Sequence, residues 1–201
     1  MNIYYTDKYT GGRGESHRLL EKAFAVNTGD EERAKALIGA MKKGEHGKPY
    51  INGFSCFSIS HTGSIWAVLI ADRECGLDIQ LGRKCSYRAI AERWFAPEDV
   101  NELCGKSGYD EPESGSIDET ARISEAFFCI WARREALTKA LGGTVYDPGL
   151  PAVLPGHAEV NGKCYSISDI ELPAESRLYA AICVEGSSPV SISEIRDLGK
   201  V

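Results

Sequence analysis

The first quarter of the chain combines one strand pattern with two helix patterns. Residues Asn2 to Asp7 alternate weakly between apolar and polar side chains, which predicts a short strand. Apolar residues recur at helical spacing over Glu15 to Val26 and again over Glu31 to Met41, and each run predicts a helix. The stretch 42–49, rich in lysine, glycine and proline, then predicts a charged turn.

The next segment has the composition of a β-sheet. Aromatic and β-branched residues are concentrated in Phe54 to Ser60 and in Ile65 to Ala71, and Thr62-Gly63-Ser64 separates the two runs. This pattern predicts a β-hairpin, because a short glycine-containing link between two such runs is typical of one. A third strand is predicted over Gly76 to Leu81.

Helix patterns dominate the middle of the chain. Tyr87 to Phe95 predicts a helix that ends before a proline, and Glu98 to Leu103 predicts another. The stretch from Gly105 to Glu119 is rich in Gly, Ser, Pro and acidic residues, which predicts a loop and a boundary between two halves. The longest helix pattern runs from about Ser124 to Leu141 and ends at a glycine pair. Short strands are then predicted over Ala158–Val160, Lys163–Glu171, Leu178–Val184 and Val190–Ile195.

One short segment occurs twice in the chain. Cys56-Phe57-Ser58-Ile59-Ser60 recurs as Cys164-Tyr165-Ser166-Ile167-Ser168, and a second apolar strand pattern follows each copy. Chance is an alternative explanation, because strands use a narrow set of residue types. A true duplication predicts an α+β fold built as a pseudo-dimer of two similar α+β halves, residues 1–105 and 106–201, with a ligand site at the seam between them.

Composition and charge exclude several classes of protein. The chain has 201 residues, of which 43% are hydrophobic and 26% charged, as in an ordinary soluble globular protein. Its formal net charge of -6 argues against binding of nucleic acid through the overall field of the protein, because phosphate neutralisation needs clustered Lys and Arg, and a local basic patch is the alternative. No long apolar run or signal-peptide pattern is present, so we expect no membrane span and a cytoplasmic location. Seven cysteines without a Cys-x-x-Cys pair predict reduced thiols rather than disulfides or a thiolate zinc site.

The predicted third strand carries two oxygen-bearing side chains. Residues two apart in a strand point to the same side, so Asp78 and Gln80 share one face while Leu77 and Ile79 occupy the other. Such a pair could hold a hard cation such as Mg²⁺, which commonly takes one or two carboxylates together with water and substrate phosphate. The alternative is an ordinary edge strand with a polar face.

The long helix pattern carries a second candidate group. Trp131, Glu135 and Lys139 recur every four residues and therefore lie close to one stripe of the helix. The alternative is an exposed Glu–Lys pair, worth about 0.3 to 0.5 kcal/mol, with Trp131 in the core. Arg133 and Arg134 add positive charge in the same turn, which suits an anionic ligand or equally a solvated helix face.

Two turns offer groups that bind phosphate. Ser60-His61-Thr62-Gly63 ends a predicted strand with an imidazole, hydroxyls and glycine backbone, and Lys48 lies in the earlier charged turn. Ser60 and His61 do not form part of a hydrolase triad, because neighbouring residues in a strand point to opposite faces. A structural histidine at a strand end and an exposed lysine turn are the alternatives.

The order of these segments along the chain resembles a known family. Gly47-Lys48-Pro49, Phe57 to Gly63, Gly76 to Gln80 and Trp131 to Lys139 follow one another as in the 4'-phosphopantetheinyl transferase superfamily, of the surfactin-synthetase-activating (Sfp-like) type. The Gly-Leu-Asp-Ile motif and the Trp-x-x-Arg-Glu-x-x-x-Lys motif carry the resemblance. Members of this type are pseudo-dimers of two α+β halves that bind coenzyme A between them, which agrees with the repeat.

The resemblance implies an activity and its partners. It implies transfer of the 4'-phosphopantetheine arm of coenzyme A to a serine of an apo acyl or peptidyl carrier protein, with release of adenosine 3',5'-bisphosphate. Mg²⁺ would be the cofactor, coenzyme A the co-substrate, and the enzyme a monomer. The stretch 105–119 falls where relatives receive the carrier protein. A catalytically silent homologue that binds coenzyme A or a carrier protein is the alternative.

The resemblance also implies roles for individual residues. Asp78 and Glu135 would be Mg²⁺ ligands, with the metal bridging to the coenzyme A pyrophosphate. Lys139 would neutralise charge that develops on the phosphates. The positions that contact the nucleotide phosphates in relatives correspond here to Arg18, Lys48, Ser60 and His61.

Three details of the site are left open by the sequence. Many relatives carry Glu where this chain has Gln80, and an amide oxygen can still coordinate a metal but brings no negative charge. Either Glu135 or a metal-bound water could take the serine proton. Glu98 falls in an aromatic and acidic segment of relatives, and its role is open.

Overall fold

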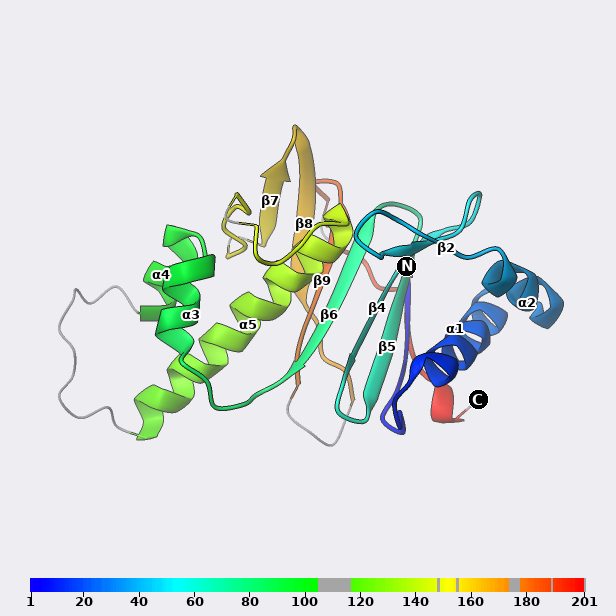
Figure 1. Cartoon of the computed structure of the whole chain (residues 1–201), viewed down its shortest axis with the longest axis horizontal. Helices are drawn as coiled ribbons and strands as arrows, with labels where there is room; N and C mark the ends of the chain where they lie inside the picture. The colour runs from blue at the N-terminus through cyan, green and yellow to red at the C-terminus, as the bar shows by residue number, and fades with distance from the viewer. Residues whose placement is uncertain (105–116, 148, 155, 174–177, 189, 201) are drawn as a thin grey trace.

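The computed structural model describes residues 1–104, 117–147, 149–154, 156–173, 178–188 and 190–200, and the chain has an α+β fold (Figure 1). Two four-stranded sheets lie between two groups of helices. The loop predicted over Gly105 to Glu119 lies largely outside the described residues. Among the described helices, none is both long enough and apolar enough to cross a membrane.

The first sheet has the strand order β10-β1-β5-β4. Its strands are β1 (Asn2–Thr6), β4 (Cys56–Thr62), β5 (Ile65–Ala71) and β10 (Glu194–Asp197). The predicted hairpin is confirmed, since β4 and β5 pair antiparallel and Thr62 lies opposite Ile65. Gly63, between them, has φ +54°, a conformation that glycine adopts without steric cost. The two predicted strand patterns are therefore joined by a two-residue turn.

The second sheet is antiparallel and has the order β6-β9-β8-β7. Its strands are β6 (Cys75–Leu81), β7 (His157–Val160), β8 (Lys163–Asp169) and β9 (Leu178–Glu185). Asn161-Gly162 links β7 to β8 with positive φ at both residues, as an Asn-Gly hairpin turn requires. The strand that follows each hairpin joins the other sheet: β6 follows β4–β5 and pairs with β9, whereas β10 follows β8–β9 and pairs with β1.

Helices and short elements complete the chain. They are α1 (Arg13–Thr28), α2 (Glu31–Gly39), β2 (Lys42–Lys43), β3 (Pro49–Tyr50), α3 (Tyr87–Trp94), α4 (Pro97–Cys104), α5 (Ile117–Leu141) and η1 (Leu198–Lys200). The boundary between α1 and α2 follows from local chemistry. Gly29 closes α1 in the left-handed conformation, and the Asp30 side chain accepts a hydrogen bond from the Arg33 N–H at the start of α2.

Two predicted boundaries differ from the structure by four residues or more. The long helix α5 begins at Ile117, seven residues before the predicted start at Ser124. The last strand covers Glu194–Asp197 instead of Val190–Ile195. Val190 and Ile192 are apolar because they pack against the core between the sheets, and strand pairing begins only beyond them.

The elements form four layers, and three apolar cores lie between them. Trp66 and Val68 on β5 pack against α1 and α2, whereas Leu69 on the opposite face of β5 packs against Leu77 and Ile79 of β6. The third core lies between the second sheet and helices α3, α4 and α5. Strand β5 is therefore covered on both faces, which explains its unbroken apolar sequence.

This layering decides the two faces of β6. Leu77 and Ile79 point into the core between the sheets, as the sequence predicts. Gly76, Asp78 and Gln80 alternate with them and face the side on which α5 packs. The strand thus carries its polar side chains into a layer that is otherwise apolar.

Gly76 marks the closest approach of β6 to α5, and Gly76→Ala is expected to be destabilising. An added Cβ would lie 1.8 Å from the Ala136 carbonyl oxygen and 2.6 Å from the Ala140 nitrogen. Because these are helix backbone atoms, the whole of α5 must shift. We expect chemical denaturation to give a loss of about 3 kcal/mol, the upper range for overpacking.

The matched control for this prediction is Gly39→Ala at the end of α2, where an added Cβ meets nothing within 4 Å. We expect no loss of stability in this variant, because alanine has the higher helix propensity. Equal stability of the two variants would contradict the close approach at Gly76.

Candidate active site

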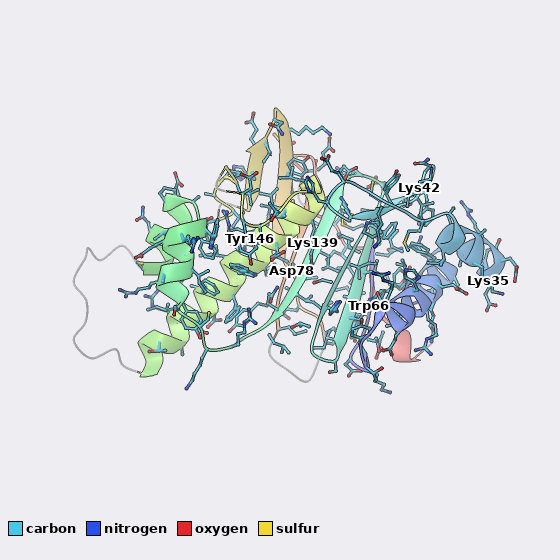
Figure 2. The ribbon with its side chains drawn as sticks, viewed as in Figure 1. Lys35, Lys42, Trp66, Asp78, Lys139 and Tyr146 are labelled. Carbon is cyan, nitrogen blue, oxygen red and sulfur yellow. The ribbon has the colours of Figure 1, made fainter. Side chains whose placement is uncertain are left out.

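Strand β6 and helix α5 bring together charged residues that are far apart in the sequence. The Lys139 ammonium lies 2.6 Å from Asp78 Oδ1, and both residues are labelled in Figure 2. Gln80 Nε2 donates to the second Asp78 oxygen at 2.7 Å. Asp78 is 2% exposed, so its carboxylate depends on protein groups in place of water.

Ser60 completes this cluster from β4. Its hydroxyl donates to Asp78 Oδ1 at 2.9 Å and accepts a hydrogen bond from the Lys139 ammonium at 3.0 Å. The Ile79 N–H donates to the same oxygen at 3.2 Å. Four predicted site residues, which come from three separate segments, therefore meet: Ser60, Asp78, Gln80 and Lys139.

The outer edge of β6 supplies further anchors for the cluster. Lys139 Nζ donates to the Leu77 carbonyl at 3.0 Å, and Lys48 Nζ donates to the Cys75 carbonyl at 3.2 Å. The Leu77 N–H donates to the Ser58 hydroxyl at 3.0 Å. Side chains thus take the place of a neighbouring strand along this edge.

Glu135 lies one helical turn before Lys139, and its carboxyl has a raised pKa. Burial is the largest cause, and the negative charge of Asp78 raises the pKa further, while Lys139 acts in the opposite direction. Two carboxylates therefore interact electrostatically with one ammonium group in a half-buried site, and Asp78 is the one in its ion pair. This charge excess is the situation in which a second cation is stabilising.

The donor set fits a hard cation. Asp78 and Glu135 supply carboxylate oxygens, and Gln80 could add an amide oxygen, although its amide nitrogen faces Asp78 in this structure. Mg²⁺ needs only one or two protein carboxylates when substrate phosphate and water complete its shell. Among the described residues there is no group of three His, Cys, Asp or Glu side chains that could form an all-protein site.

Lys48 lies at the end of the cluster. Besides the Cys75 carbonyl, its ammonium reaches Glu74 Oε2 at 3.0 Å and the Ala140 carbonyl at 3.0 Å. The side chain is 22% exposed, so Lys48 is not the fully exposed lysine of the alternative interpretation. It joins the charged turn to the end of α5 and the start of β6.

His61 points away from Ser60, as neighbouring residues in a strand do. It lines a groove of about 580 Å³ together with Tyr9, Arg13, His17, Lys43 and Gly63. Its ring lies 5.2 Å from that of Tyr9. The sequence interpretation missed Arg13 and Lys43, which come from separate segments. The Gly11-Gly12 pair before α1, with positive φ at both residues, is the local signal that precedes Arg13.

Arg18 does not line this groove. Its side chain is 76% exposed and its nearest charged partner is Glu15, at 3.5 Å. The structure therefore brings His61 to the groove and leaves Arg18 on the neighbouring surface of α1.

Arg133 and Arg134, the adjacent arginines of α5, have structural partners. Arg133 Nε lies 2.7 Å from Asp169 Oδ1. Arg134 is fully buried, 3.8 Å from Asp99, with its guanidinium carbon 5.5 Å from the centre of the Phe95 ring. The sequence suggested that Arg134 either binds an anionic ligand or lies on a solvated helix face. Both interpretations are wrong for Arg134, because it is buried beside Asp99. Glu98, next to Asp99, is exposed on α4.

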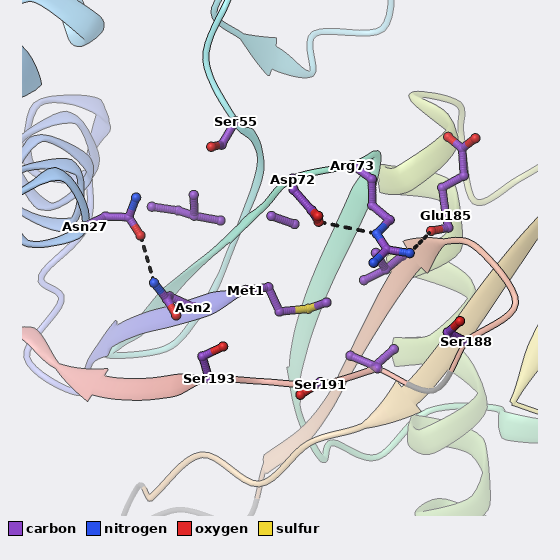
Figure 3. A pocket seen from close by; sticks show the side chains of 14 residues that line it. Met1, Asn2, Asn27, Ser55, Asp72, Arg73, Glu185, Ser188, Ser191 and Ser193 are labelled. Carbon is purple, nitrogen blue, oxygen red and sulfur yellow. Dashed lines mark hydrogen bonds and ion pairs between the residues drawn. The ribbon is translucent and has the colours of Figure 1, made fainter.

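A second cavity, of about 450 Å³, contains none of the predicted site residues (Figure 3). Arg73 in its wall pairs with Asp72 at 3.3 Å and donates to the Glu185 carbonyl at 3.3 Å. Asn2 donates to Asn27 at 3.0 Å. Because these polar groups satisfy one another, the cavity is not assigned a role in the site.

Comparison with known proteins identifies relatives of the chain. No protein-family model matches it. The 4'-phosphopantetheinyl transferase AcpT of Salmonella typhi is 31% identical over 131 residues, which cover 61% of this chain and 62% of that protein. AcpT of Salmonella typhimurium is 30% identical with the same coverage of both chains. The 4'-phosphopantetheinyl transferase gsp of Aneurinibacillus migulanus is 27% identical over 108 residues, 54% of this chain and 40% of that protein.

Over part of its length the chain is therefore similar to several proteins named 4'-phosphopantetheinyl transferase. The resemblance predicted from the motifs is therefore confirmed. The chain spans less than two thirds of the length of the relatives it matches.

Glu135→Gln is expected to stabilise the metal-free protein at neutral pH. The folded-state pKa of Glu135 is raised by burial and by Asp78, so its charged form opposes folding. Removing the charge should raise the Tm at pH 7. Below the unfolded-state pKa, near 4.5, both proteins carry a neutral side chain and the difference should disappear. Thermal unfolding in chelator-treated buffer from pH 4 to pH 8 measures this effect, and an equal or lower Tm for Glu135→Gln at pH 7 would contradict it.

Proposed function

We propose that this protein is a 4'-phosphopantetheinyl transferase that modifies an apo acyl or peptidyl carrier protein. The products are the holo carrier protein and adenosine 3',5'-bisphosphate, and the reaction requires Mg²⁺. The observation that carries the proposal is that Glu135 interacts electrostatically with the Asp78–Lys139 ion pair in one half-buried cluster. The similarity of the chain to proteins named 4'-phosphopantetheinyl transferase supports it.

The chemistry is a phosphoryl transfer. The carrier serine oxygen bonds to the phosphorus that bears the pantetheine arm, and the bond from that phosphorus to the bridging pyrophosphate oxygen breaks with its electron pair. Catalysis of such a step depends on positioning and on stabilising negative charge. Asp78 and Glu135, with Gln80 as a weaker donor, would hold Mg²⁺, whose positive charge favours departure of the nucleotide.

Lys139 supplies the fixed positive charge of the chain itself. Its hydrogen bonds to Ser60 and to the Leu77 carbonyl hold the ammonium in place before substrate binds. A preorganised cation costs no reorganisation at the moment of transfer. Glu135 and a water in the site are the two candidate acceptors of the serine proton, and the raised pKa of Glu135 suits this task.

The basic groove is the proposed site for the nucleotide end of coenzyme A. Arg13, His17, Lys43 and His61 give it positive character in a protein whose net charge is -6. Ser60 and His61 are adjacent on β4 and face opposite sides, so one strand serves both the cluster and the groove. Lys48 and Arg18 lie beside these two regions, and we propose them as further phosphate contacts.

We further propose that the fold is a pseudo-dimer and that the cluster lies at its seam. The repeated segment begins both the β4–β5 and β8–β9 hairpins, and each hairpin is followed by a strand that joins the other sheet. Ser60 and Asp78 come from residues 1–105, whereas Glu135 and Lys139 come from residues 106–201. This arrangement supports the duplication over chance similarity.

A catalytically silent homologue that binds coenzyme A is the second candidate. Gln80 is the observation that favours it, because its amide nitrogen occupies one oxygen of Asp78 and brings no negative charge. Tight coenzyme A binding that does not change with Mg²⁺ would identify this function.

Intact-mass measurement on a panel of apo carrier proteins tests the transfer. With coenzyme A and Mg²⁺, one carrier or more should gain the mass of one phosphopantetheine arm, and a chelator should prevent the gain. Asp78→Asn and Glu135→Gln should lower the rate by at least ~100-fold while the protein stays folded, because each removes the negative charge of a proposed metal ligand. Glu159→Gln on the exposed edge of β7 is the control. Near-normal rates in both site variants would contradict the metal assignment.

His61→Ala tests the orientation of coenzyme A. If His61 meets the 3'-phosphate, the variant should bind coenzyme A about tenfold more weakly, as expected for one lost hydrogen bond to a charged group. Binding of 3'-dephospho-coenzyme A should hardly change. His157→Ala, an exposed histidine on β7, is the matched control, and calorimetry gives all affinities. An equal loss for both ligands would assign His61 to another part of the nucleotide.

A further inference from the structure

The outer edge of β6 raises a question about main-chain hydrogen bonding. β6 is the edge strand of one sheet and β4 the edge strand of the other, and no strand pairing joins them within the described residues. Both strands are nevertheless largely buried. Every second N–H of an antiparallel edge strand points away from its partner strand, and a buried N–H without an acceptor is costly.

Two serines of β4 supply the missing acceptors. Ser58 Oγ accepts from the Leu77 N–H at 3.0 Å, and Ser60 Oγ accepts from the Ile79 N–H at 3.2 Å. The spacing of two residues is the same on both strands, as in a true ladder. The two hydroxyls therefore accept hydrogen bonds from β6 in place of the carbonyls of a neighbouring strand.

The two serines differ in one respect. Ser60 contacts Asp78 and Lys139 directly and belongs to the cluster. Ser58 is 4% exposed, has no hydrogen bond to either residue, and does not line the basic groove. Ser58 is connected to the site through the main chain of Leu77. The Leu77 carbonyl accepts a hydrogen bond from Lys139, and Asp78 is the next residue in the chain.

We propose that Ser58 is a positioning residue that sets the place of the Asp78 carboxylate for a divalent cation. This inference rests on the proposed function. Ser58 fixes the main chain at the Leu77 N–H, and the carbonyl of the same residue leads to Asp78 and accepts from Lys139. The fixed main chain of Leu77 orients both the carboxylate and the ammonium group of Lys139. Loss of the Ser58 hydroxyl frees the first of the two serine contacts between β4 and β6 and lets β6 move against β4. Residues that support metal ligands in this way typically affect metal affinity by about 10- to 100-fold.

The repeat provides a matched control. Ser166 on β8 is the counterpart of Ser58, is 7% exposed, and donates to the carbonyls of Gly186 and Ser188 at 2.8 and 2.9 Å. It is a buried serine with main-chain partners in the same motif, but it has no hydrogen bond to the cluster. Ser166→Ala should cost stability without affecting the cation.

The experiment compares direct cation binding in these variants. Binding of Mn²⁺, a paramagnetic substitute for Mg²⁺, is measured by electron paramagnetic resonance with and without coenzyme A, and the Tm is recorded for each protein. Ser58→Ala should lower Mn²⁺ affinity about 10- to 100-fold, whereas Ser166→Ala should leave it within about twofold of the unsubstituted protein. Ser58→Cys keeps the volume with a weaker acceptor and should give an intermediate loss. Ser58→Thr keeps the hydroxyl and should restore affinity.

Two results would overturn the proposal. The first is unchanged Mn²⁺ affinity in folded Ser58→Ala or Ser58→Cys, even if the Tm falls. The second is an equal loss of affinity in Ser58→Ala and Ser166→Ala, which would indicate a general effect of stability. Failure of the unsubstituted protein to modify any carrier, with Mn²⁺ binding intact, would contradict only the proposed function. Absence of Mn²⁺ binding in the unsubstituted protein would overturn both.

Discussion

The unpaired outer edge of β6 is the constraint on which the rest of the site depends. Within the described residues no strand covers this edge, and four side chains satisfy its main-chain groups: Lys48, Ser58, Ser60 and Lys139. An unsatisfied buried main-chain group would cost about 1 to 3 kcal/mol. Three of these side chains also belong to the predicted site. The same residues therefore stabilise the sheet edge and set the geometry of the cluster.

The second constraint is electrostatic. Asp78 and Glu135 place two carboxylates near one ammonium group, and burial makes this charge excess more costly than it would be in water. The close approach of α5 to β6 at Gly76 makes the arrangement possible, because any larger side chain would separate the helix from the strand. Without a ligand the site has an excess of negative charge. A divalent cation together with an anionic substrate would neutralise this excess. This is the electrostatic argument for the proposed chemistry.

The position of β4 connects the parts of the molecule. One face of this strand packs toward the helices α1 and α2 and carries His61 into the basic groove. The opposite face meets β6 and carries Ser58 and Ser60. The two faces of this single strand therefore contribute to the cluster and to the basic groove. Antiparallel pairing with β5 runs along the whole of β4.

Sequence alone determined the local structure: the β4–β5 hairpin, the common face of Asp78 and Gln80, and the helical stripe that holds Glu135. Each follows from a period of two or 3.6 residues, which depends only on neighbouring positions. Only the tertiary structure decided the burial and the partners of the charged side chains. Arg134 has the local pattern of an exposed arginine but is buried against α4. Lys48 belongs to a charged turn, but its ammonium donates hydrogen bonds to carbonyls of β6 and α5. Burial and hydrogen-bond partners of long side chains depend on segments far away in the sequence, and no local period contains that information.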